Sequence, residues 1–123
     1  AVLCLAYLGM KRGQALKGNL DLLVLAVLAA RPMHGYAVIE ALRVRSGDAF
    51  DLPEGTVYPV LHRLSKAGLL ESEWTAAAGR PRRTYQLTDR GHAALNEQRN
   101  QWQEFVEATS AVLKGVQTCP NPI

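Results

Sequence analysis

The chain has 123 residues, of which 48% are hydrophobic and 20% are charged. This length fits one domain with a small core, marginal for a monomer, and the composition excludes a disordered or fibrous chain. The formal net charge of +3 is too small to hold a polyanion by bulk charge, so any binding of phosphates depends on where individual cations converge.

Residues 1–15 are expected to form an N-terminal extension. Residues 1–9 are apolar, but no cationic region precedes them, so a signal peptide fits poorly. Met10 resembles a natural start, and we therefore expect residues 1–9 to come from an upstream start or the expression vector. Cys4 and Cys119 show no CxxC spacing and cannot form the dense disulfide framework of a small secreted fold, which favours a reducing cytoplasm.

Two helices are predicted in the first half of the chain. Residues 20–30 are apolar on nearly every side, which is typical of a central buried helix. This stretch is too short to cross a bilayer, and no membrane association is expected. Residues 36–43 carry apolar Tyr36, Ile39 and Leu42 at i, i+3 and i+6, which predicts a supporting second helix that packs through this face.

Residues 54–66 form the most informative segment, an amphipathic third helix. At about 100° per residue, an apolar stripe gathers on one side: Val57, Val60, Leu61 and Leu64. The other side carries an aromatic ring, an imidazole and two cations: Tyr58, Pro59, His62, Arg63 and Lys66. No carboxylate lies between Thr56 and Lys66, so this face suits phosphates and base edges, although an ordinary solvated helix face is the alternative.

Pro59 lies inside this helical pattern. Because a proline cannot donate a backbone hydrogen bond, either the first turn after Glu54 is loose or the regular helix begins later. We expect an irregular helix start that is held against DNA phosphates.

A β-hairpin with a basic tip is predicted next. Residues 69–75 and 83–87 read as two strands around a loop at residues 76–82. Within residues 79–83, a glycine and a proline are expected to keep the tip extended, away from the body of the domain. The tip carries three cations: Arg80, Arg82 and Arg83. A helix followed at once by a basic hairpin is typical of a winged helix-turn-helix.

A long last helix is predicted from Thr88, whose hydroxyl can cap the first turn, with Asp89 suitably placed at the positive end of the helix dipole. Large apolar side chains from Leu95 to Leu113 form a heptad-like seam. The winged-helix body leaves little core for this seam, so we expect a second copy of the chain to pack on residues 88–113. The alternative is that the helix folds back on its own domain.

The expected fold is therefore mainly α with a small β-hairpin. Residues 16–87 would form a winged helix-turn-helix domain, and residues 88–114 a C-terminal dimerisation helix. Residues 115–123, with two prolines, are expected to form a loose tail.

Several short motifs resemble, in order and spacing, those of the PadR family of bacterial transcriptional regulators. They lie in the third helix, the hairpin and the start of the last helix: Gly55-Thr56-Val57-Tyr58-Pro59-Val60-Leu61-His62-Arg63-Leu64, Gly68-Leu69-Leu70, Gly79-Arg80-Pro81, Tyr85 and Leu87-Thr88-Asp89-Arg90-Gly91. The resemblance covers residues 16–113. It implies a homodimeric DNA-binding repressor with an N-terminal winged helix and a C-terminal dimerisation helix.

We expect the protein to bind double-stranded DNA at an inverted-repeat operator, as a homodimer that represses by blocking polymerase. Its third helices would enter successive major grooves, while the hairpins lie along flanking minor grooves or phosphates. The expected DNA contacts are Thr56, Tyr58, Pro59, His62, Arg63, Lys66, Arg80, Arg82 and Arg83. The alternative is a winged helix that serves as a protein-interaction module; the arginine-rich hairpin favours DNA.

Trp102 lies eleven residues after Gly91, where some family members that bind flat drug-like compounds carry a tryptophan from each subunit at the dimer interface. The resemblance therefore suggests a small hydrophobic or aromatic effector, in contact with Trp102, Gln98 and Phe105. Binding would release DNA by changing the angle between the two third helices. The alternative is that this aromatic ring belongs to the dimer core.

The sequence favours neither a metal site nor catalysis. His34, His62 and His92 are spread over three segments without HxH or HExxH spacing. There is no glycine-rich phosphate loop, no GxSxG, and no pair of carboxylates set beside a histidine. We expect no enzyme activity, no metal and no cofactor.

Overall fold

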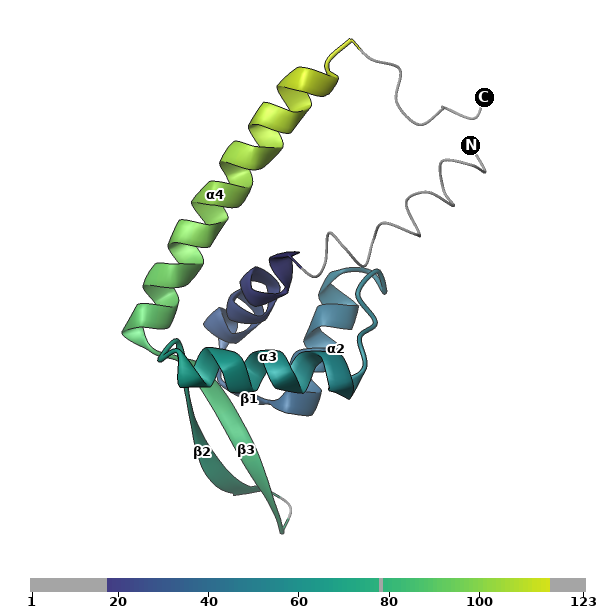
Figure 1. The fold of residues 1–123 in the computed structure, drawn as a ribbon. Helices are drawn as coiled ribbons and strands as arrows, with labels where there is room; N and C mark the ends of the chain where they lie inside the picture. The colour runs from purple at the N-terminus through teal and green to yellow at the C-terminus, as the bar shows by residue number, and fades with distance from the viewer. Residues whose placement is uncertain (1–17, 78, 116–123) are drawn as a thin grey trace.

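A computed structural model describes residues 18–77 and 79–115. In chain order the elements are a helix over residues 18–30, β1 (Met33–His34), α2 (Gly35–Arg45), α3 (Glu54–Lys66), β2 (Leu70–Ala77), β3 (Arg80–Leu87) and α4 (Asp89–Leu113) (Figure 1). We call residues 18–30 the first helix. This mainly α arrangement with a small antiparallel sheet confirms the expected fold class. The expectations for residues 1–15, for residues 116–123 and for both cysteines lie outside the described residues.

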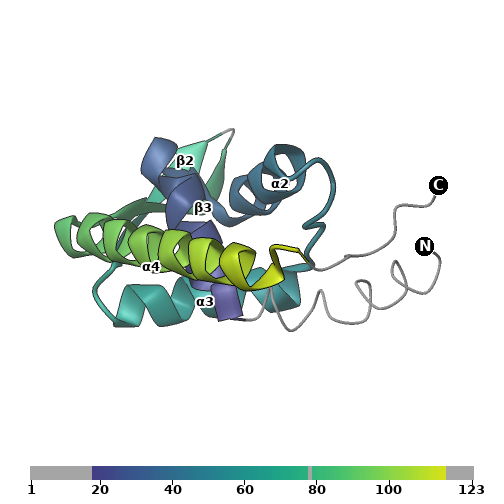
Figure 2. The ribbon, with the colours of Figure 1, turned by 90° about the horizontal axis from the view of Figure 1, so that it is seen from above.

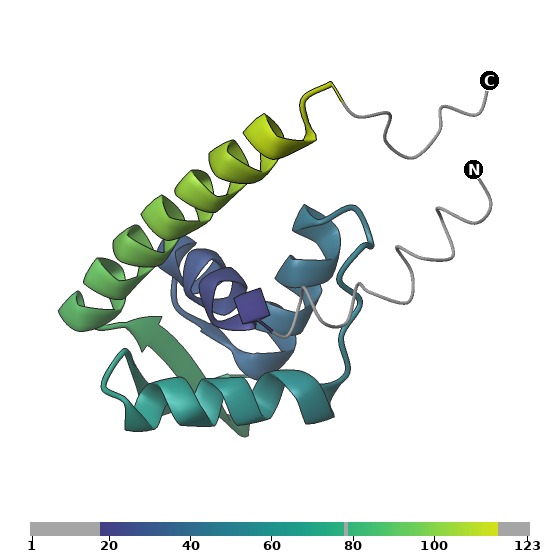
Figure 3. The same cartoon turned by 45° about the horizontal axis from the view of Figure 1, so that its top comes forward.

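The first helix lies between α2, α3 and α4 (Figures 1 and 3). Val24 and Leu25 are fully buried, as the nearly all-round apolar pattern predicts. In α2, Val38 is fully buried, whereas Tyr36 is 61% exposed, so the predicted apolar face of this helix is wrong at Tyr36. The reason is that Gly35 closes against α3 and turns the next residue outward. Within the described ranges, no helix is long and apolar enough to span a membrane.

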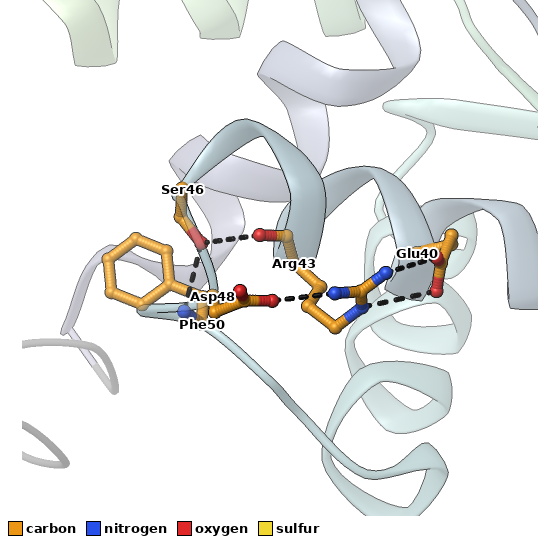
Figure 4. A network of polar contacts seen from close by, with 5 residues as sticks. All are labelled: Glu40, Arg43, Ser46, Asp48 and Phe50. Carbon is orange, nitrogen blue, oxygen red and sulfur yellow. Dashed lines mark hydrogen bonds and ion pairs between the residues drawn. The ribbon is translucent and has the colours of Figure 1, made fainter.

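An ion-paired turn joins α2 to α3 (Figure 4). Arg43 bonds to Glu40 one helical turn earlier and to Asp48 in the turn, the latter at 2.6 Å. These contacts, first the hydrogen bond to Glu40, raise the pKa of Arg43. The Ser46 hydroxyl donates to the Arg43 carbonyl and accepts from the Phe50 amide. Together these bonds hold the turn in the shape that leads the chain into α3.

Helix α3 begins at Glu54 and contains Pro59 in its interior, so neither a loose first turn nor a later start occurs. The amides of Thr56 and Val57 both donate to the Pro53 carbonyl, which closes the first turn. Proline cannot donate to the carbonyl four residues earlier, on Gly55. That glycine is exposed, and its carbonyl can reach solvent, so the proline is tolerated without breaking the helix.

The sheet has the order β1-β3-β2 and is antiparallel. Strands β2 and β3 stay in register from Leu70 opposite Leu87 to Ala77 opposite Arg80. The predicted loop at residues 76–82 is therefore wrong, because both strands continue almost to the tip, where Gly79 takes a positive φ of 76°. Strand β1 was not anticipated; it pairs only with residues 84–85 of β3.

The start of α4 is tied closely to the end of α3. The Thr88 hydroxyl accepts from the Gly91 amide at 3.0 Å, the predicted cap, and donates to the Gly68 carbonyl at 2.7 Å. Gly91 lies against the chain at Leu69, where an added Cβ would be 2.1 Å from the carbonyl oxygen. Beyond Leu95, which is buried, α4 passes across the first helix and leads away from the hairpin (Figures 1 and 2).

Candidate nucleic-acid interface

Helix α3 divides into a buried stripe, an outer line and two flanks. The stripe is buried as predicted: Val57, Val60, Leu61 and Leu64. Opposite it, at about 100° per residue, Pro59, His62 and Lys66 form an exposed outer line. Thr56 and Arg63 lie on one flank and Tyr58 lies on the other. The outer line is the part of α3 that is free to enter a groove.

Tyr58 does not lie on the free outer face that was expected from the sequence. Its side chain is partly buried and packs against the core, and its ring rests on Gly35, where an added Cβ would be 2.5 Å from the ring. Burial raises the pKa of Tyr58. Tyr58 is partly buried because α2 begins with Gly35 at the point where α2 and α3 approach each other, which leaves room for the tyrosine ring. Only part of the tyrosine ring remains available to a ligand.

Arg63 is held by a carboxylate from the first helix. Its two terminal nitrogens donate to the two oxygens of Asp21, at 2.8 and 2.7 Å. The expectation of a face without carboxylates is therefore wrong at this flank, because Asp21 lies 42 residues earlier in the chain. These hydrogen bonds raise the pKa of Arg63. The arginine side chain is 58% exposed, so the pair contributes only about 0.2–1 kcal/mol to stability.

A hollow of about 440 Å³ lies between the start of α2, α3 and the hairpin. It brings together four of the expected DNA-contacting residues: Tyr58, Arg80, Arg82 and Arg83. His34, Tyr36 and Trp74 also line it, and none of them was assigned a DNA contact from the sequence. The Glu54 carboxylate beside the Tyr36 hydroxyl raises the pKa of that tyrosine. The hollow is therefore lined by both arginines and aromatic residues.

The hairpin arginines lie on strand β3, so they alternate between its two faces. Arg82 lies on the face that also carries His34, and its guanidinium lies 3.1 Å from Nε2 of that histidine. Arg83 faces the opposite side, donates to the Ser72 hydroxyl at 2.9 Å, and stacks over the Trp74 ring at 5.7 Å. Trp74 is 68% exposed, so this pair offers both a cation and a flat apolar surface to a partner.

The other five expected DNA contacts do not line the hollow: Thr56, Pro59, His62, Arg63 and Lys66. Trp74 was missed because the expected loop at residues 76–82 would place Thr75, and not Trp74, opposite Arg83. In the structure the strands continue to the turn at Gly79, and the antiparallel register places Trp74 opposite Arg83. Tyr36 was missed because it was assigned to the buried face of its helix.

A second hollow, also about 440 Å³, lies between the start of the first helix and α4. All three expected effector contacts line it: Gln98, Trp102 and Phe105. The two aromatic rings are stacked, with centroids 6.1 Å apart. Asp21, the partner of Arg63, lines the same hollow. Among the described residues, no group of three metal-ligating side chains comes together.

Residues 24–97, more than half of the chain, match the profile of the Transcriptional regulator PadR-like family. Transcriptional regulator Rv3488 of Mycobacterium tuberculosis is 40% identical over 77 residues, which cover 63% of this chain and 69% of that protein. The fold is similar to a PadR family transcriptional regulator from Eggerthella lenta, with TM-score 0.80, 30% identity, and 94% and 99% of the two chains covered. A PadR-like transcriptional regulator from Bacillus cereus gives TM-score 0.73, 29% identity, and 83% and 98% coverage.

Proposed function

The chain belongs to the PadR-like family of transcriptional regulators, and we propose that it represses transcription by binding an inverted-repeat DNA operator as a homodimer. The observation that carries this proposal is the hollow in which Arg80, Arg82 and Arg83 gather beside α3 and the start of α2. A chain of low net charge needs such a local concentration of cations to bind phosphates.

In this proposal, α3 enters the major groove with its outer line of Pro59, His62 and Lys66. His62 can exchange hydrogen bonds with base edges, and Lys66 can contact a phosphate. Thr56 and Arg63 on one flank, and the exposed part of Tyr58 on the other, face the phosphate strands that border the groove.

The hairpin would add affinity that does not depend on sequence. Its arginines contact flanking phosphates or the minor groove, and the Trp74 ring can pack on deoxyribose. A protein-interaction module has no comparable need for three arginines at one end of strand β3.

Enrichment of random duplexes on the purified protein tests the operator. The proposal predicts an inverted repeat whose half-sites are about 10 base pairs apart, or a multiple of this distance. Enrichment of a single half-site, or of no sequence, would contradict it.

The proposed dimer forms through α4. Five large apolar side chains on this helix are exposed in one chain: Trp102, Phe105, Val106, Val112 and Leu113. A surface this apolar is typical of an interface. Sedimentation equilibrium should give twice the mass of one chain. Phe105→Glu should yield monomers, whereas Ala111→Glu, on the opposite side of α4, should remain dimeric; a monomeric wild-type protein would contradict the proposal.

The second hollow is the proposed effector site. Its stacked Trp102 and Phe105 rings suit a flat hydrophobic or aromatic molecule, and Gln98 can orient polar groups on it. Because α4 also forms the proposed dimer contact, an occupant there can change the angle between the two α3 helices and release the operator. A panel of flat aromatic compounds should quench tryptophan emission of Trp74→Phe protein. Equal quenching after Gln98→Ala and Phe105→Ala would contradict this site.

A further inference from the structure

The pair between Asp21 and Arg63 joins two surfaces that the proposed function keeps separate. Arg63 stands on a flank of α3, the helix proposed to enter the major groove. Asp21 stands on the first helix and lines the hollow beside α4. The two terminal nitrogens of Arg63 donate hydrogen bonds to the two carboxylate oxygens of Asp21, at 2.8 and 2.7 Å. Such a two-point contact fixes the direction of the guanidinium as well as its charge.

This geometry engages both terminal nitrogens of Arg63 in bonds to Asp21. An arginine on the flank of a groove-binding helix would contact the bordering phosphate strand through the same nitrogens. In the free protein, Arg63 instead turns back toward the first helix. Its side chain is nevertheless 58% exposed and that of Asp21 is 32% exposed, so the contact is open to exchange.

A phosphate and a carboxylate offer the same kind of partner to a guanidinium, two oxygens in one plane. One Arg63 side chain cannot satisfy both in this two-point manner. We propose that Asp21 competes with DNA for Arg63, so that each protomer must break this ion pair before its arginine can contact the operator backbone. The inference rests on the proposed DNA binding.

Asp21 is then a positioning residue that lowers operator affinity through Arg63. It also links the hollow beside α4 to the flank of α3, because a change at Asp21 in that hollow alters the availability of the Arg63 cation. This ion pair is a direct polar connection from that hollow to α3.

The test is a double-mutant cycle on DNA affinity, measured by anisotropy of a labelled duplex from the region upstream of the gene. Asp21→Asn keeps the shape of the side chain and removes its charge. It should tighten binding by up to about fivefold for each protomer, the upper end of the range expected for removing an exposed ion pair. In the Arg63→Ala background, the same change should have no such effect, because the competition has been removed.

Two controls separate competition from other effects of Asp21. Glu107→Gln removes the same charge from an exposed position on α4 and should leave the affinity unchanged. Circular dichroism reports whether each variant is folded, and Asp21→Ser provides a second removal of the carboxylate. If Asp21 merely repelled DNA at long range, its removal would tighten binding equally in both backgrounds.

Tightening that requires Arg63 supports the proposal. Equal tightening in both backgrounds would overturn it, and so would an unchanged affinity. Weaker binding by Asp21→Asn would also overturn it, because the ion pair would then hold α3 in the shape that binds DNA. A wild-type protein that binds neither operator nor unrelated duplex would overturn both this inference and the proposed function. Tight wild-type binding without the predicted coupling would overturn the inference alone.

Discussion

Gly91→Ala should destabilise the protein although it replaces a helical glycine with the best helix former. Gly91 is buried in the first turn of α4, and an added Cβ would lie 2.1 Å from the Leu69 carbonyl oxygen and 3.2 Å from Leu87. The first contact is with backbone, which cannot rotate away. The Leu69 carbonyl also accepts a hydrogen bond from the Thr88 amide at 3.1 Å, so relief of the clash must strain that bond.

The expected size follows from three opposing terms. Forcing a methyl group into a packed site costs about 1–3 kcal/mol, and weakening the hydrogen bond at Leu69 adds up to about 1 kcal/mol. The higher helix propensity of alanine returns about 1 kcal/mol. Gly91→Ala should therefore lower the free energy of unfolding by about 2 kcal/mol.

Urea unfolding followed by circular dichroism measures this change, at one protein concentration because association contributes to stability. Gly55→Ala is the matched control. Gly55 also lies in the first turn of a helix, but its Cβ would meet nothing within 4 Å, so this variant should be neutral or more stable by up to about 1 kcal/mol. If Gly91→Ala were as stable as Gly55→Ala, the close approach of α4 to Leu69 would be refuted.

Three further variants test separate contacts. Thr88→Ala should cost about 1 kcal/mol in urea unfolding through loss of the α4 cap, while Thr88→Ser, which keeps the hydroxyl, should cost much less; equal losses would reject the cap. Gly35→Ala should cost about 1–3 kcal/mol in wild-type protein but almost nothing beside Tyr58→Ala, and additive losses would show that the ring is not the obstacle. Arg82→Ala should weaken binding to all duplexes alike and flatten the slope of log Kobs against log salt by about 0.9 per protomer; an unchanged slope would remove this arginine from the interface.

Local patterns predicted the elements of this fold well. The stripe of Val57, Val60, Leu61 and Leu64 is buried throughout, because helical periodicity and burial are set by neighbours three or four residues away. The cap at Thr88 is equally local, since a hydroxyl at that position needs only the amide three residues later. The hairpin was also predicted correctly, although its strands extend to Ala77 and Arg80 and the loop expected from Gly79 and Pro81 is shorter.

The errors fall where distant segments meet. The pairing of Arg63 with Asp21 spans 42 residues, and no spacing rule connects them. Tyr58 was assigned to the outer face because its contact with Gly35 depends on how α2 and α3 cross. Pro81 was taken as a loop residue, yet it pairs with Ala76 in a part of β3 that strand β1 does not reach, where a missing donor costs little.

The most direct test of DNA binding is the anisotropy of a labelled duplex from the region upstream of the gene, titrated with the full chain at several salt concentrations. The proposed interface predicts tight binding that unrelated DNA competes for poorly and that weakens steeply with salt. Weak binding that does not depend on salt would contradict the proposed interface and favour a winged helix that binds another protein.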